Sequence, residues 1–136
     1  MTFADAFCGK LEEIHCNYRR GTDDDGQDTL FLGVSGDSFS GLQLGVLFDD
    51  NTSAQIHCHI CKFPTTKNLL ALQMVNQLNL KYRWTKFSAT SSGVVRVTVD
   101  VMAAEDAAAD VLFHNLCRMN AIIDEAYPIL MKAIYS

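Results

Sequence analysis

Hydrophobic residues recur at two different spacings along the chain, and the change from one to the other separates predicted helices from predicted strands. The first apolar set has members three or four residues apart: Phe3, Phe7, Leu11, Ile14 and Tyr18. This is the spacing of one face of an α-helix. We therefore predict an amphipathic helix over positions 3–18, with Thr2 as its N-cap and Asp5 completing a capping box.

Alternating apolar and polar residues follow in three short segments, the pattern of β-strands with one buried face. These segments cover positions 30–34, 42–48 and 55–61. Turn-forming residues at 36–41 and 49–52 join them. Because parallel neighbours need a long crossover, connections this short predict antiparallel pairing. The acidic stretch 21–28 has no apolar residue and is predicted to be a solvated loop.

A second helix is predicted over positions 66–80, where leucines lie on more than one side of the helical wheel. A helix that is apolar on two sides can bury one side in the core and the other against a second subunit, so we expect a dimer contact here. The candidate dimer interface consists of Leu69, Leu72, Gln73 and Asn76.

Two more strands, 84–89 and 94–101, form a predicted hairpin, and a long helix follows over 105–134. Pro128 is expected to kink this helix or split it, because proline removes a backbone donor. The predicted fold is therefore α+β, in the order α-β-β-β-α-β-β-α. We expect one domain over positions 1–136, with a five-stranded antiparallel sheet and helices packed on one face.

Charge is strongly segregated along the chain, whose formal net charge is −5. Positions 51–99 hold six basic residues and no acidic one, whereas both flanking segments are acidic. Two interpretations remain open: the basic middle packs beside the acidic ends, or the asymmetry steers a partner. The sequence contains no run of about 18 apolar residues, so we predict no membrane span. Five cysteines without disulfide-framework spacing favour a reducing compartment, so we expect a cytoplasmic protein.

The run His57-Cys58-His59-Ile60-Cys61 is the first candidate for chemistry. Strand alternation places His57, His59 and Cys61 on one face, where two imidazoles and a thiol suit zinc or copper. The alternative is an outer sheet face with two polar histidines and a buried Cys58. The C-x-x-C spacing does not favour redox chemistry, because reactive pairs of this kind lie at a helix N-terminus.

Three other patterns suggest chemistry but are incomplete. The run Asp23–Gly26 lacks the flanking ligands of a calcium loop. The block Gly36–Phe39 resembles the nucleophile block of GDSL hydrolases, yet no matched base follows it. Tyr82, Trp84 and Phe87 among basic residues are typical of nucleic-acid binding, but the acidic composition opposes it. We therefore expect no enzyme, no cofactor and no nucleic-acid partner.

Four blocks of sequence carry a family resemblance. They are Ala71–Asn79 at a helix end, the strand Trp84–Ser88, the turn and valine strand Gly93–Asp100, and Met119–Pro128. Together they resemble the YbjN family of bacterial sensory transduction regulators. The resemblance implies a type III secretion chaperone-like fold and a single YbjN-like domain. The histidines and cysteines of positions 57–61 are not part of it.

Families of this fold resemble adaptor-like dimers that bind polypeptides. We therefore predict a non-enzymatic bacterial regulator or chaperone-like module that forms a homodimer and binds a protein or peptide. An extended peptide could join a sheet edge or lie on the sheet. The candidate partner-binding residues lie on the sheet face away from the helices: Gln43, Gly45, His57, His59, Arg96 and Thr98. The alternative is a metal- or small-ligand-binding protein that uses His57, His59 and Cys61.

Overall fold

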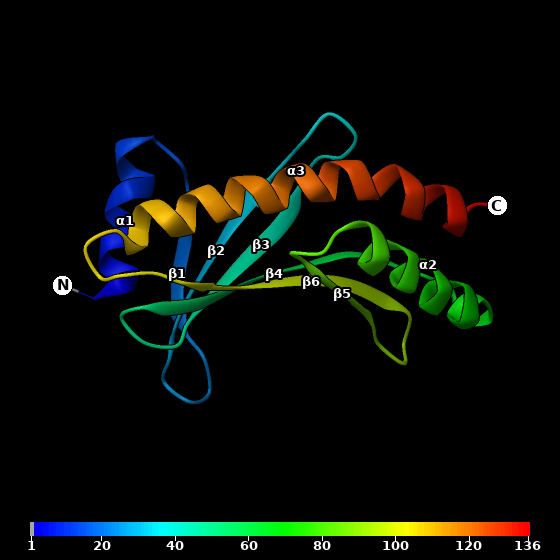
Figure 1. Ribbon diagram of the computed structural model, residues 1–136, viewed down its shortest axis with the longest axis horizontal. Helices are drawn as coiled ribbons and strands as arrows, with labels where there is room; N and C mark the ends of the chain where they lie inside the picture. The colour runs from blue at the N-terminus through cyan, green and yellow to red at the C-terminus, as the bar shows by residue number, and fades with distance from the viewer. Residues whose placement is uncertain (1) are drawn as a thin grey trace.

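The computed structural model describes residues 2–136 as three α-helices on one side of a six-stranded antiparallel sheet (Figure 1). The elements in chain order are α1 (Phe3–Glu13), β1 (Arg19–Thr22), β2 (Asp28–Val34), β3 (Leu42–Phe48), β4 (Ser53–Lys62), a 3-10 turn (Thr65–Lys67), α2 (Asn68–Lys81), β5 (Lys86–Ala89), β6 (Val94–Met102) and α3 (Ala108–Ile134). The strands lie side by side in the order β1-β2-β3-β4-β6-β5. The α+β class and the antiparallel pairing are confirmed.

The predicted sheet of five strands lacks one strand, β1. The predicted loop over positions 21–28 includes the second half of β1, and no strand is predicted for Arg19 and Arg20. All four residues of β1 are exposed, and the strand pairs with β2 at the edge of the sheet. An edge strand that is exposed on both faces has no alternation of apolar and polar residues to reveal it. The turn that follows is held by the Asp23 carboxylate, which accepts the amides of Asp25 and Gln27 at 3.0 and 2.9 Å.

The first helix begins as predicted but ends five residues early. The Thr2 hydroxyl accepts the Asp5 amide at 3.1 Å and the Asp5 carboxylate accepts the Thr2 amide at 3.0 Å, which confirms the capping box. His15 then adopts the left-handed conformation at φ 57°. The Cys16 amide donates to Leu11 at 2.9 Å, as in a Schellman motif, and the chain turns toward β1.

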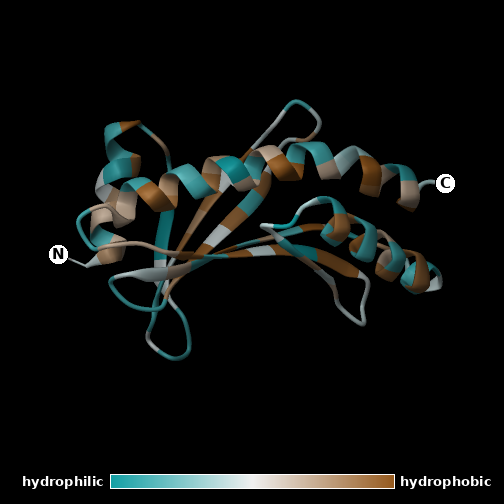
Figure 2. Cartoon of the chain, in the orientation of Figure 1, coloured by the Kyte–Doolittle hydropathy of each residue, from teal (hydrophilic) through white to brown (hydrophobic). Residues whose placement is uncertain are grey.

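The core lies between the sheet and α3, which crosses it (Figures 1 and 2). The buried stripe of α3 contains the predicted residues Leu112, Leu116, Met119, Ile123, Ala126 and Leu130. The predicted split at Pro128 is wrong, because α3 continues through that residue as one helix. The Asp124 carbonyl, four residues earlier, accepts a hydrogen bond from Ser38 in place of the missing amide.

One sheet edge is covered and the other is open. The side-chain amide of Asn79 on α2 donates to the Phe87 carbonyl at 2.9 Å, and the Phe87 amide donates back to it at 2.8 Å. Asn79 therefore takes the place that a further strand would occupy beside β5. The opposite edge is β1, which is paired on its β2 side only.

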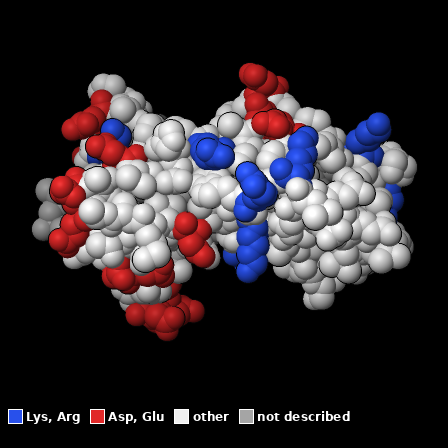
Figure 3. Space-filling model, in the orientation of Figure 1, with Lys and Arg blue, Asp and Glu red and all other residues white. Residues whose placement is uncertain are grey.

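The segregated charges do not neutralise one another by pairing. The ion pairs with Asp or Glu within residues 2–136 join Lys10 to Asp110 and Arg20 to Asp5 and Asp28. None uses a basic residue from positions 51–99, so this segment forms no ion pair with the acidic ends within residues 2–136, and both interpretations of the charge pattern stay open. Acidic side chains gather around α1, whereas basic ones lie toward the end with α2 (Figure 3).

Candidate functional site

The outer face of the sheet, away from the helices, carries one row of side chains that crosses all six strands. The strand register places six residues opposite one another in sequence: Arg19, Phe31, Gly45, His57, Thr98 and Lys86. Directly opposite residues of an antiparallel sheet point to the same face. The row therefore forms a continuous surface from one sheet edge to the other.

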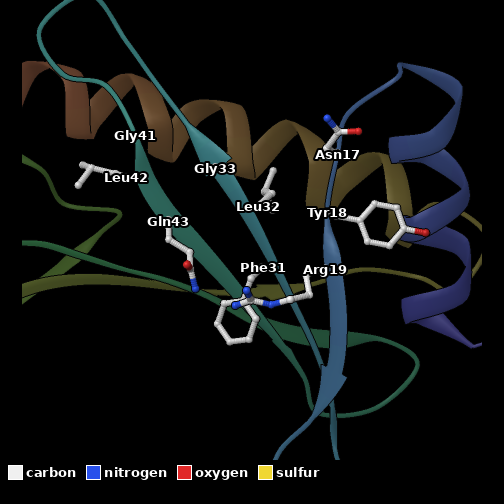
Figure 4. A pocket seen from close by; sticks show the side chains of 9 residues that line it. All are labelled: Asn17, Tyr18, Arg19, Phe31, Leu32, Gly33, Gly41, Leu42 and Gln43. Atoms are coloured by element: carbon white, nitrogen blue, oxygen red, sulfur yellow. The ribbon is translucent and has the colours of Figure 1, made fainter.

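Gly45 lies at the centre of this row and makes room for the rings beside it. A Cβ atom at Gly45 would lie 2.3 Å from the His57 ring and 3.0 Å from the Phe31 ring. The two rings meet above the glycine with centroids 6.2 Å apart, edge to face. The Arg19 guanidinium lies 5.4 Å from the Phe31 centroid (Figure 4). Glycine at this position thus leaves room for the close approach of two aromatic side chains.

A second row lies beside the first. His59 on β4 is opposite Arg96 on β6, which is opposite Ser88 on β5. A shallow hollow of about 280 Å³ joins the two rows, lined by Phe31, Gln43, Gly45, His57 and His59. Burial lowers the pKa of His57 below its ordinary value of 6.5, and the neighbouring Arg96 and His59 lower it further. The His57 ring is thus held in its neutral form beside a permanent cation.

The six predicted partner-binding residues all occupy this outer face. Gly45, His57 and Thr98 belong to the first row, and His59 and Arg96 to the second. Gln43 lies two residues from Gly45 on the same strand and lines the hollow. Sequence reasoning missed Arg19, because its strand was not predicted. It also missed Phe31, although the alternation of β2 already placed that residue on the polar side.

Cys61 does not share the face of His57 and His59, contrary to the predicted metal-binding set. The register of β4 shifts between His59 and Cys61, so that Cys61 is opposite Val95, a core residue. Burial raises the pKa of the Cys61 thiol to about 11, which opposes the thiolate that a metal needs. Over residues 2–136 no three His, Cys, Asp or Glu side chains form a group that could hold a metal ion. The predicted metal-binding set is therefore wrong, and the binding of a small ligand other than a metal stays a prediction.

The outer side of α2 is apolar and exposed, as the two-sided pattern predicted. Leu69 is 69% exposed, Leu72 55% and Leu80 76%. The polar residues among them, Gln73 and Asn76, are also exposed, so the four predicted dimer-interface residues lie on the surface. The inner side of the helix buries Ala71, Val75 and Leu78.

Ser38 joins a loop of the sheet to α3. Its hydroxyl lies 2.7 Å from both the main-chain oxygen and the carboxylate of Asp124, so it anchors the β2–β3 loop on α3. A serine nucleophile needs a neighbouring base that can take its proton. The carboxylate beside this hydroxyl already accepts the amides of Ser38 and Asp37, and these bonds hold the pKa of Asp124 below its ordinary value, which makes it a weak base. This arrangement does not correspond to the nucleophile of a hydrolase.

The aromatic residues of the basic segment pack against other side chains of the protein. Phe87 is buried, and the Tyr82 ring packs on it with centroids 6.1 Å apart. The Trp84 ring is covered by the Arg118 guanidinium at 5.4 Å. These rings therefore do not form an open surface on which bases could stack.

The three helices lie on one side of the antiparallel sheet, and the other face of the sheet carries no helix. The model of the YbjN family, described as "Putative bacterial sensory transduction regulator", matches residues 4–129. The chain belongs to the YbjN family. No curated protein matches it. None of the helices between residues 2 and 136 is both long and apolar enough to cross a membrane.

Proposed function

We propose that this member of the YbjN family is a non-catalytic regulator that binds another polypeptide on the outer face of its sheet. The contact residues of this proposal are Gln43, Gly45, His57, His59, Arg96 and Thr98, extended by Arg19 and Phe31. The observation that carries the proposal is the row across all six strands, centred on the two rings above Gly45. The family description as a regulator agrees with a protein that acts by binding.

The face offers what polypeptide recognition uses. Partly exposed aromatic rings supply contact area at a low cost in side-chain entropy, and arginine is enriched where proteins bind one another. The row combines both, with a guanidinium over one of its rings. Imidazole, amide and hydroxyl groups around the hollow supply donors and acceptors for a main chain.

The proposal includes a homodimer formed by α2. Three exposed leucines lie on its outer side, and between Asn68 and Leu80 the helix has no charged residue. Two copies could therefore pack these sides together without burying an unpaired charge. Sedimentation equilibrium should give a dimer for the wild type and a monomer for Leu72→Glu. Met102→Glu, which alters an exposed residue of β6, is the matched control and should remain a dimer.

Two further parts of the proposal concern the fold family and the compartment. The type III secretion chaperone-like fold implied by the resemblance is supported by the helices on one side of an antiparallel sheet. A cytoplasmic location is supported by five cysteines that are all free.

The binding proposal is tested by affinity capture from the native lysate, read by quantitative mass spectrometry. The wild type is compared with a His57→Ala/His59→Ala double variant and with His114→Ala, which alters an exposed histidine on α3. A polypeptide retained by the wild type and the α3 variant but lost by the double variant would support the proposal. Equal capture by all three proteins would contradict it.

A further inference from the structure

The outer face of the sheet is cationic although the protein as a whole is acidic. Its strands present four permanent cations to this side: Arg19, Lys62, Lys86 and Arg96. The carboxylate that these strands present on the same side, within residues 2–136, is that of Asp100. Asp100 accepts a hydrogen bond from Gln55 at 3.2 Å. The face thus has an excess of positive charge on a chain of net charge −5.

These four cations have no acidic partner of their own. The ion pairs within residues 2–136 involve Lys10 and Arg20, which lie elsewhere. The Arg96 Nε atom is buried and has no hydrogen-bond partner in the described part of the chain. A buried donor without an acceptor destabilises the protein, and an acceptor supplied by a bound partner would remove that penalty.

The surroundings of Arg96 suit a carboxylate. His59 and Ser88 flank it on the neighbouring strands, and His57 and Thr98 lie in the adjacent row. An acceptor bound by the guanidinium would therefore also lie within reach of hydroxyl and imidazole donors. No carboxylate of the protein approaches the guanidinium closely enough to form an ion pair with it within residues 2–136.

We infer that the polypeptide bound by this face is an acidic extended segment, with one carboxylate on Arg96 and others near Lys86, Lys62 or Arg19. The inference rests on the proposed function and specifies its partner. Neighbouring strands are about 4.8 Å apart, so the row from Arg19 to Lys86 is about 24 Å long. An extended segment of about seven residues covers that distance.

The surroundings of these cations favour such a peptide over nucleic acid. Phosphates would also pair with the four cations, but bases need aromatic rings to stack on. Phe87 is buried, and Tyr82 and Trp84 already pack against Phe87 and Arg118. The acidic side chains around α1 would also repel a long polyanion (Figure 3).

The test is a selection of random 12-residue peptides displayed on phage against the wild-type protein. The selected pool is expected to be enriched in Asp and Glu over the starting library. Its affinity should fall about tenfold for Arg96→Gln, the loss expected for one charge-assisted pair. Lys86→Gln, at an exposed position that cannot disturb the core, should weaken binding in the same direction. Lys132→Gln, at an exposed position on α3, is the matched control and should bind as the wild type does.

The possible outcomes separate this inference from the proposed function. Peptides selected without acidic enrichment, and bound equally by Arg96→Gln and Lys86→Gln, would overturn the acidic partner but leave polypeptide binding in place. Failure to select any peptide would overturn both. A labelled oligothymidylate that binds the wild type and displaces the selected peptides, with loss in Arg96→Gln, would replace the acidic peptide by nucleic acid.

Discussion

The hydroxyl of Ser38 lies 2.7 Å from the main-chain oxygen of Asp124, a residue 86 positions away in sequence. That oxygen would ordinarily accept the amide of the residue four positions later in α3, which is Pro128 and has none. The loop between β2 and β3 therefore supplies the donor that the proline removes. The Asp124 carboxylate in turn accepts the amides of Asp37 at 3.1 Å and Ser38 at 2.7 Å, which holds its pKa below the ordinary value.

Ser38→Ala should lower the free energy of unfolding by about 1–2 kcal/mol, because the Asp124 carbonyl loses its donor. Urea denaturation measures the loss. In a Pro128→Ala background the same substitution should cost clearly less, because residue 128 then supplies an amide within the helix. An equal cost in both backgrounds would show that the hydroxyl acts through the carboxylate of Asp124 and not through the carbonyl.

Gly45→Ala should destabilise the protein by about 1–3 kcal/mol, the usual cost of forcing atoms into a filled space. The added methyl group would collide with the His57 ring. Gly33→Ala is the matched control on the same face, since a Cβ atom there has nothing within 4 Å. Combining Gly45→Ala with His57→Ala should recover part of the loss. Thermal unfolding that is unchanged by Gly45→Ala would contradict the packing of the rings above this glycine.

Asn79→Ala should cost about 1–3 kcal/mol, because the Phe87 amide and carbonyl both lose their side-chain partner. It should also expose the edge of β5 and increase aggregation on storage, which light scattering would detect. Gln77→Ala, two residues earlier and exposed, should change stability by less than about 0.5 kcal/mol. Similar losses from the two substitutions would indicate a general weakening of α2 and not a lost cover of β5.

Stability should depend on the protonation of His57. Its pKa in the folded protein is lowered by burial, so between that value and 6.5 the unfolded chain binds more protons than the folded one. The contribution of His57 to the free energy of unfolding is therefore fully present above pH 6.5 and decreases as the pH falls toward the pKa of the folded state. Denaturation between pH 5 and 8 should show a smaller decrease for His57→Gln than for the wild type. His114→Gln controls for the loss of a histidine, and parallel profiles for all three proteins would contradict the prediction.

Much of the outer face could be predicted from sequence, because side chains alternate along a strand. The polar positions of β3, β4 and β6 were identified from that alternation, and the register brings all six residues to one face. The exposed side of α2 could be predicted in the same way, since its leucines recur on a second side of the helix.

The features that were missed leave no periodic signal. The edge strand β1 consists of Arg19, Arg20, Gly21 and Thr22, with no apolar residue to mark a buried side. The register shift beyond His59 is hidden because apolar Ile60 follows His59 just as Cys58 follows His57, so the alternation looks unbroken in the sequence. The contact of Ser38 with Asp124 depends on how a loop lies against a distant helix, which local spacing does not contain.

The central claim is that the outer sheet face binds a polypeptide, and site-specific photocrosslinking in cells tests it most directly. The residue p-benzoylphenylalanine is placed at Gln43 on the outer face and, in a separate variant, at Ala121 on the exposed side of α3. The account predicts a crosslinked adduct with a second polypeptide from position 43 and none from position 121. Adducts from position 121 alone, or from neither position, would contradict it.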